Sequence, residues 1–240
     1  MGIFDNFFGD GNEIPQPVLD KVNPAEIMMP EVRDDMEGFE GQNVIVFGNP
    51  IEVGAALDFE QGDNPFGFRG NCGLVSTSNF LNLCGIEADE TLITRYAIEN
   101  GECVYSEFLP PDHNGGTTAR NIENILKAFG IESEVFYPDE RGGDLESIAE
   151  KLEQGYVGMI SVNAGYLWDD PVHVGDGSIN HRISLTGTVR DGETGELIAL
   201  TVCDSGSGEP CHVVPIELLQ DCYVNAPGAD VVFSAEPLRV

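Results

Sequence analysis

Cys72 and His181 are the two residues whose types and neighbours in the sequence could support covalent catalysis. A cysteine attacks a carbonyl carbon as its thiolate, which forms most readily at a helix N-terminus or beside a positive group. Cys72 follows Gly70 and Asn71, and the residues after it carry apolar side chains at helical spacing. We therefore expect its sulfur to face the free N–H groups of a first helical turn, which lower a thiol pKa and can hold an oxyanion. Without a partner, the simpler interpretation is that Cys72 is a small buried residue at a helix start.

His181 and Asp204 are expected to supply that partner. The segment 181–189 alternates with a period of two and places His181 on its apolar side, and the segment 197–204 alternates in the same way and ends in Asp204. If a turn joins the two segments, Asp204 lies opposite Ile183, two residues from His181 on the same face. A single histidine at such a position is ordinarily only a hydrogen-bonded interior residue. An aspartate on an apolar face costs free energy without a partner, so we expect Asp204 to orient His181 as a base requires.

The other cysteines and histidines have no comparable setting. Cys84 falls on the apolar face of the predicted helix. Cys203, Cys211, His212 and Cys222 could be imagined as zinc ligands, but they lack the close cysteine pair typical of zinc sites. We therefore expect no metal and no cofactor. The remaining candidates are expected in loops or at the edges of elements: Cys103, His113 and His173.

The negative net charge of the chain limits the kinds of molecule that it can bind. The chain of 240 residues carries 42 acidic residues against 11 lysines and arginines, a formal net charge of −31. Such a charge repels phosphate backbones and anionic lipid, which excludes nucleic-acid binding and docking on membranes through basic patches. It favours a basic partner or substrate, but the simpler interpretation is a protein kept soluble by carboxylates, for example in high salt.

The pattern of apolar residues predicts helices mainly in the first half of the chain and strands mainly in the second, which indicates an α+β fold. Helices are predicted over residues 71–85, 90–99, 119–129, 145–153 and 215–219. Strands are predicted over residues 44–47, 133–137, 158–162, 181–189, 197–204 and 231–234.

The first 40 residues differ in composition from the rest of the chain. Residues 1–40 are rich in Pro, Asp, Glu, Asn and Met, and are predicted as a partly ordered N-terminal extension to a domain of residues 41–240. This extension could also block the active-site cleft as a built-in inhibitor. No apolar run reaches the ~18 residues of a membrane span, and residues 1–11 contain no basic residue of the kind a secretory signal has. A cytoplasmic location is the default expectation, with export by a signal-less route as the alternative.

Four motifs, in order along the chain, resemble those of papain-like cysteine peptidases. They are Gln61, Asn71–Ser76 (NCGLVS), Asn180–Gly187 (NHRISLTG) and Val202–Gly206 (VCDSG). The resemblance spans about residues 43–225 and is greatest to the bacterial branch that contains the leader-processing peptidase domains of bacteriocin exporters. Asn114–Thr118 (NGGTT) and Leu167–Trp168, ahead of the histidine segment, also resemble that branch. It implies a papain-like fold, in which a helical part with the nucleophile at a helix N-terminus packs on a C-terminal antiparallel sheet.

The resemblance also implies a role for each site residue. Cys72 would be the nucleophile, His181 the general base and then the acid, and Asp204 the residue that orients the imidazole. Gln61 would donate to the oxyanion beside the backbone N–H of Cys72. The sequence departs from the family pattern in three places. Gln61 precedes Cys72 by eleven residues, further than is usual, and Arg182 stands where a small apolar residue often follows the histidine. Around the nucleophile the sequence reads Asn-Cys-Gly, without the Cys-Gly-Ser-Cys-Trp pattern of the papain and cathepsin branch.

We therefore expect a cysteine peptidase that hydrolyses peptide bonds through a Cys-His-Asp triad and a thioester intermediate. Its expected substrate is a peptide or protein, basic or glycine-rich in sequence. Two alternatives stay open. The same fold and residues would serve a deamidase, transglutaminase or amidase acting as a toxin or effector, and a non-catalytic module could use the fold to bind peptides.

Overall fold

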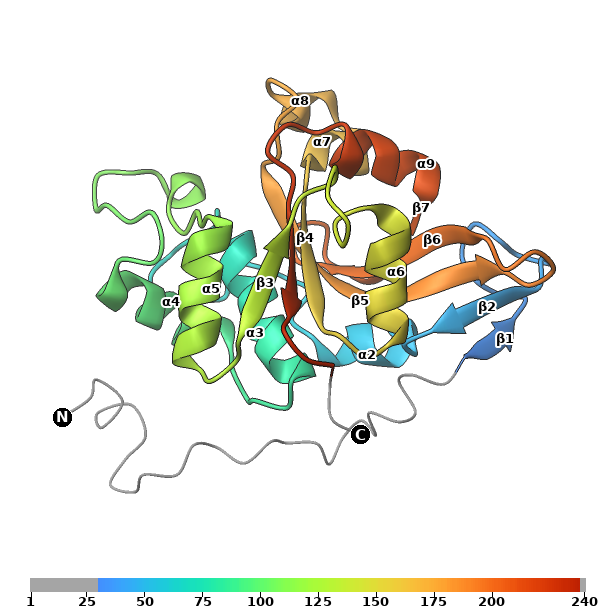
Figure 1. Cartoon of the computed structure of the whole chain (residues 1–240). Helices are drawn as coiled ribbons and strands as arrows, with labels where there is room; N and C mark the ends of the chain where they lie inside the picture. The colour runs from blue at the N-terminus through green and yellow to red at the C-terminus, as the bar shows by residue number, and fades with distance from the viewer. Residues whose placement is uncertain (1–29, 238–240) are drawn as a thin grey trace.

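One antiparallel sheet of eight strands runs through residues 30–237, the part of the chain that the computed structural model describes (Figure 1). The strands are β1 (Glu31–Arg33), β2 (Val44–Phe47), β3 (Ser133–Phe136), β4 (Gly158–Val162), β5 (His181–Asp191), β6 (Leu197–Asp204), β7 (Glu209–Pro215) and β8 (Val231–Ser234). The helices are α2 (Pro50–Ala56), α3 (Cys72–Leu83), α4 (Glu90–Asn100), α5 (Ala119–Ala128), α6 (Leu145–Glu153), α7 (Ala164–Leu167), α8 (Pro171–Val174) and α9 (Ile216–Leu219). Helical turns also lie at Pro111–His113 and Gln220–Val224. The strand order is β1-β2-β5-β4-β8-β3, and β6 pairs with both β5 and β7. The predicted α+β class is confirmed.

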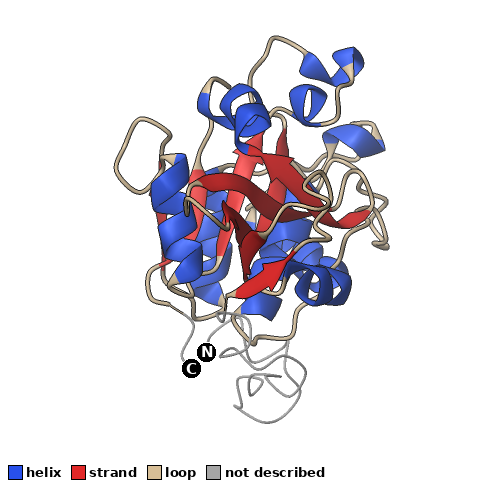
Figure 2. Ribbon diagram, turned by 90° about the vertical axis from the view of Figure 1, so that its right-hand side faces the viewer, coloured by secondary structure: helices blue, strands red, loops and turns tan. Residues whose placement is uncertain are grey.

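Helices cover both faces of this sheet, because successive side chains of a strand point to opposite sides. Met159 of β4 packs with residues of α3, α4 and α5, whereas its neighbour Ile160 packs with residues of α6. Val232 and Val231 of β8 divide between the two sides in the same way. Figure 2 shows the strands running between the groups of helices. The sheet therefore lies between two large hydrophobic clusters, one on each of its faces.

The β5–β6 hairpin carries His181 at its start and Asp204 at its end. Ser184 pairs with Cys203, which places Asp204 opposite Ile183, as the sequence predicted. Two irregularities further along the hairpin shift the register by one residue and then back again. The end of the hairpin near His181 therefore keeps the register expected from the turn, and the aspartate reaches the histidine.

α3 lies against β5 and begins at Cys72. The hydroxyl of Ser76 in its second turn donates to the backbone carbonyl of Arg182 across 3.0 Å. Residues Gly73 to Leu81 of this helix are all buried, because the sheet covers one side and α4 and α5 cover another. The helix start and the strand start are thereby held side by side, although more than 100 residues separate them in the chain.

The elements that the sequence did not predict are short or lack alternation. They are β1, α2, α7, α8 and β7. α2 has a start signal in Pro50 at its first position, but Gly and Ala in its second half weaken the helical pattern. β7 contains Cys211 and His212, two of the four residues considered above as zinc ligands.

Residues 30–40 of the predicted extension pack on the sheet. β1 pairs antiparallel with β2, and the buried side chain of Met36 packs with Val44 and Val189. The remainder of the predicted extension, residues 1–29, lies outside the described residues. Between residues 30 and 237, none of the helices has both the length and the apolar character needed to cross a membrane.

Candidate active site

Cys72 is the first residue of α3, and its side chain is half-buried against the start of β5. Burial alone would raise the pKa of the thiol, but the hydrogen bond and the charge of His181 lower it. The backbone N–H of Arg182 lowers it further by donating a hydrogen bond to the sulfur. The pKa of Cys72 therefore lies below its ordinary value, and more of the thiol is present as the nucleophilic thiolate.

His181 lies between Cys72 and Asp204. Its Nε2 is 2.7 Å from Asp204 Oδ1, and the two residues are 6% and 0% exposed. Because Nε2 shares its proton with the carboxylate, Nδ1 is the nitrogen left to bond with the Cys72 thiol. Burial alone would lower the pKa of His181, but the hydrogen bonds with Asp204 and Cys72 outweigh it and raise the pKa to about 10.

Asp204 is an ionised carboxylate in this arrangement. Burial alone would raise its pKa, but the hydrogen bond and charge of His181, together with a hydrogen bond from Trp168, hold that pKa well below the ordinary range. The carboxylate therefore stays negative at any pH at which the protein is ordinarily studied, and it stabilises the protonated form of the neighbouring imidazole.

Trp168 closes the other side of the histidine–aspartate pair. Its indole N–H donates to Asp204 Oδ2 across 2.7 Å, and its ring centroid is 5.0 Å from that of His181. Gly206 lies against both rings, where a Cβ would come within 2.7 Å of Trp168 and 2.9 Å of His181. The Gly206 N–H also donates to Asp204 Oδ1 across 2.8 Å. Each carboxylate oxygen thus has a fixed donor, and the imidazole is held in one orientation.

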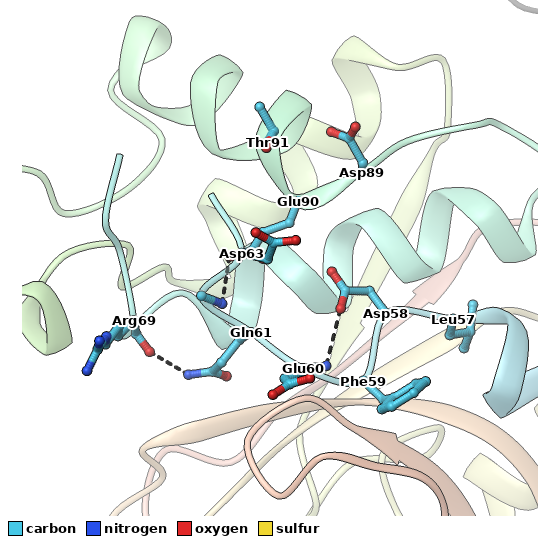
Figure 3. A pocket seen from close by; sticks show the side chains of 11 residues that line it. Leu57, Asp58, Phe59, Glu60, Gln61, Asp63, Arg69, Asp89, Glu90 and Thr91 are labelled. Atoms are coloured by element: carbon cyan, nitrogen blue, oxygen red, sulfur yellow. Dashed lines mark hydrogen bonds between the residues drawn. The ribbon is translucent and has the colours of Figure 1, made fainter. Parts of the chain in front are cut away.

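Gln61 lies in the loop that joins α2 to α3, beside the turn that follows Asp204. Its backbone N–H donates to the carbonyl of Ser205 across 3.0 Å, and the Ser205 hydroxyl donates to Gln61 Oε1 across 3.2 Å. Gln61 Nε2 donates to the carbonyl of Arg69 across 2.5 Å (Figure 3). An amide nitrogen carries two N–H groups, so a second donor is available to another acceptor. The hydrogen bonds of Gln61 go to the two segments that flank the site.

The other five cysteines have the opposite electrostatic environment. Burial raises their pKa values, to about 12 for Cys84, Cys203 and Cys222, to about 11 for Cys103, and upward for Cys211. All six cysteines are free thiols. Within residues 30–237, no three His, Cys, Asp or Glu side chains are placed so that they could hold a metal ion, and this includes the four imagined as zinc ligands.

The other three histidines have separate surroundings. His173 lies in α8 and its Nδ1 is 2.7 Å from Asp170 Oδ2. His212 lies in β7 with its Nδ1 3.5 Å from Glu209 Oε2, so it does have the acidic neighbour that the sequence did not reveal. His113 ends the short helical turn that begins at Pro111.

The sequence did not predict the roles of Trp168 and Arg182. Trp168 is the only tryptophan of the chain, and its place ahead of the histidine segment was the one available signal. The Arg182 side chain is buried and donates to Asp230 Oδ1 across 2.7 Å. The alternation of residues 181–189 predicted Arg182 on the side opposite the apolar one, so its burial was not predicted, and a buried guanidinium requires a charged partner such as Asp230.

A scan against protein-family models and a search of curated proteins return no match for this chain. Among solved structures, the chain is similar to the crystal structure of a double-glycine-motif protease from an AMS/PCAT transporter in complex with the leader peptide, with 15% identity and a TM-score of 0.41 over 69% of this chain and 85% of that one. It is also similar to a Bacillus anthracis protein named for its likeness to C39 peptidases, with 12% identity and a TM-score of 0.48 over 70% of this chain and 90% of that one. Both are of the class of peptidase that the sequence motifs resemble. Because both TM-scores lie below 0.5, these likenesses carry no weight in assigning chemistry to the site.

Proposed function

We propose that this protein is a cysteine peptidase that hydrolyses peptide bonds, with Cys72 as nucleophile, His181 as general base and acid, and Asp204 as the residue that orients the imidazole. The observation that supports the proposal best is the environment of Cys72. It is the one thiol with a lowered pKa among six, it begins a helix, and it is hydrogen-bonded to a buried imidazole whose other nitrogen binds a buried carboxylate. The papain-like arrangement that the sequence resembles requires the same groups in the same roles.

The first half of the reaction would form a thioester. The Cys72 thiolate attacks the carbonyl carbon of a peptide bond, and the carbonyl oxygen takes up the negative charge. The backbone N–H of Cys72 belongs to the first turn of α3, where amides have no partner within the helix, and it can hold this oxyanion together with the second N–H of Gln61 Nε2. His181 then gives its Nδ1 proton to the leaving amine, the C–N bond breaks, and the acyl group remains on the sulfur.

The second half would release the acid product. His181, now neutral, takes a proton at Nδ1 from a water molecule whose oxygen attacks the thioester carbon. The tetrahedral intermediate collapses, expels the Cys72 thiolate and leaves a carboxylic acid. Asp204 stays ionised throughout, so Nε2–H keeps pointing at the carboxylate and Nδ1 keeps facing the sulfur.

A comparison of two cysteine variants tests the proposal. The wild-type chain, Cys72→Ala and Cys103→Ala are each incubated with a library of synthetic peptides, and mass spectrometry identifies the products. We expect cleavage by the wild type and by Cys103→Ala, which lacks a half-buried thiol of raised pKa, and no cleavage by Cys72→Ala. Thermal melting checks that all three chains are folded. Cleavage by folded Cys72→Ala would overturn the proposal.

The same products separate hydrolysis from the alternative acyl transfers. New peptide termini indicate a peptidase. Release of ammonia from glutamine peptides without chain cleavage would indicate a deamidase, and joining of a peptide to an added amine would indicate a transferase. Peptide binding without any turnover would favour a non-catalytic module.

A further inference from the structure

A cavity with several acidic residues in its wall opens beside Gln61 (Figure 3). Its volume is about 870 Å³, and five of the eleven residues that line it are acidic. These are Asp58, Glu60, Asp63, Asp89 and Glu90. Arg69 is the single basic residue among the eleven, so the wall carries net negative charge. A cavity of this size can accommodate a side chain of a bound peptide together with part of its backbone.

Glu90 gives this wall a buried oxygen that lacks a donor. The residue begins α4 and is 3% exposed. Its Oε1 accepts hydrogen bonds from the Gly62 N–H at 2.9 Å, from the Asn64 amide at 2.7 Å and from the Asn71 amide at 2.5 Å. Its Oε2 is buried and has no hydrogen-bond partner. Leaving a buried carboxylate oxygen unpaired is unfavourable, so a cationic donor that enters the cavity is stabilised there.

The neighbouring carboxylates strengthen the negative field at the same place. Figure 3 shows the carboxylates of Asp58, Asp63 and Glu90 gathered between the first turn of α4 and the loop that follows α2. The pKa of Asp58 is raised, first by burial and then by the negative charges of Glu90, Asp63 and Glu60. Mutual repulsion of this kind is relieved by a bound positive charge.

The cavity lies next to the candidate active site. Gln61 forms part of its wall, and Asn71, whose amide binds Glu90, is bonded directly to Cys72. Glu90 is linked to Cys72 by one hydrogen bond to Asn71 and one peptide bond, and consecutive Cα atoms are about 3.8 Å apart, so the two sites lie within the reach of a few residues of extended peptide. A substrate with its scissile bond at Cys72 can therefore place a side chain in the cavity from a position a few residues away.

We propose that this cavity is the subsite for a lysine or arginine side chain of the peptide substrate, with the carboxylate of Glu90 in its wall as the acceptor. The inference rests on the proposed peptidase function for its substrate. Leu57 and Phe59 supply an apolar part of the wall, against which the methylene stem of the side chain packs. Asp58 and Asp63 lie around its charged end.

Cleavage of matched peptides tests the subsite. Peptides that differ at one position, carrying lysine, arginine, norleucine or glutamate, are offered to the full chain, and kcat/KM is measured for each position in turn. We expect one position at which lysine or arginine is preferred over norleucine by about tenfold or more, and glutamate is disfavoured. Equal rates for the four peptides at every position would overturn the subsite while leaving the peptidase proposal intact.

Substitutions of residues in the cavity wall then test whether the preference for lysine arises in this cavity. Glu90→Gln is expected to bring the ratio of lysine to norleucine rates towards one. Because Glu90 also anchors neighbouring loops, Asp63→Asn provides a second variant: its side chain is exposed and lines the same cavity, so its loss should reduce the ratio without unfolding the chain. Glu99→Gln, an exposed carboxylate on the same helix outside the wall, is the matched control and should keep the wild-type ratio. An unchanged ratio in both Glu90→Gln and Asp63→Asn would overturn the assignment.

A binding measurement separates the cavity from the chemistry. Nuclear magnetic resonance titration of the full chain carrying Cys72→Ala compares acetyl-Gly-Gly-Lys-Gly-Gly-amide with its norleucine analogue. Tighter binding of the lysine peptide, abolished by adding Glu90→Gln, supports the subsite even if the wild type cleaves nothing, in which case only the peptidase proposal fails. Equal binding of the two peptides overturns the subsite.

Discussion

Trp168 donates its indole N–H to Asp204 across 2.7 Å, so the two oxygens of this buried carboxylate have separate partners. The tryptophan holds Oδ2, and His181 binds Oδ1. The carboxylate cannot turn about its own bond without breaking both hydrogen bonds. The orientation of the imidazole therefore depends on a residue outside the three that carry the proposed chemistry.

Replacement of this tryptophan tests its positioning role. Trp168→Phe keeps an aromatic ring beside His181 and removes the donor to Asp204 Oδ2. The unpaired buried oxygen should lower the free energy of unfolding by about 1–3 kcal/mol. Without this donor the His181 imidazole spends less time in the orientation that proton transfer requires. We therefore expect kcat to fall by about tenfold with little change in KM. The pKa of Asp204, which this donor helps to hold down, should rise and can be followed by carbon-detected resonance of its carboxylate.

Tyr166→Phe is the control for that experiment. Tyr166 lies in α7, two residues before Trp168, and is 40% exposed. It should retain the wild-type kcat and carboxylate pKa. A Trp168→Phe variant that is destabilised but has unchanged kcat would show that the tryptophan serves stability alone.

The lowered pKa of Cys72 predicts selective alkylation in weak acid. At pH 6, iodoacetamide should modify Cys72 far faster than the other five cysteines, since only thiolate reacts and their pKa values are raised by burial. His181→Ala removes the hydrogen bond and charge that lower the pKa, and should reduce this labelling to the slow rate of the other thiols. Peptide mapping of the modified sites over time measures both rates. Fast labelling that survives in folded His181→Ala would contradict the ion-pair interpretation.

The histidine–aspartate pair predicts a pH-dependent share of stability. The pKa of His181 is raised to about 10 in the folded chain, above its ordinary value of 6.5, so its contribution is complete below about pH 6.5 and is lost as pH rises through about 10. The pKa of Asp204 is lowered, so its contribution is present above about pH 4 and is lost as pH falls through the folded value. Asp204→Asn should therefore cost most between about pH 4 and 6.5, where we expect a loss of about 3 kcal/mol. Urea unfolding of both chains across this range measures the difference, and a difference independent of pH would contradict the prediction.

Gln61 is predicted to act in the transition state rather than in substrate binding. Gln61→Ala removes one proposed oxyanion donor, so kcat should fall by about 10²–10³ while KM changes little. Gln154→Ala, an exposed glutamine at the end of α6, is the matched control and should have wild-type kinetics. A fall confined to KM would assign Gln61 to the substrate cavity that it lines instead.

The parts of the site that could be predicted from the sequence are those governed by local periodicity. The segments 181–189 and 197–204 alternate, and one turn joins them. These two features were sufficient to place Asp204 opposite Ile183, on the same face as His181 and two residues along the strand from it. The helical pattern after Asn71 was sufficient to place Cys72 at a helix start. Both signals come from the spacing of side chains within single elements.

The parts that could not be predicted arise from contacts between elements. Trp168 reaches Asp204 because α7 folds over the turn after β6, and no period in the sequence records that approach. The partner of Arg182 is Asp230, which precedes β8, and pairing of β8 beside β4 is what brings the two charges together. Glu90 likewise binds Asn71 from a different helix. In each case the partner comes from another element, which the spacing of residues within one element does not reveal.

Asp204 also closes the turn at Ser205–Gly208, because its Oδ1 accepts from the N–H groups of Gly206 at 2.8 Å and Ser207 at 3.4 Å. Asp204 Oδ1 thus binds both this turn and the His181 imidazole, so a movement of the turn also disturbs the imidazole. Fraying of this short surface segment would inactivate the proposed peptidase while the sheet beneath it remained intact. Loss of turnover on warming would then precede global melting, and activity would report on the most local unfolding event in the molecule.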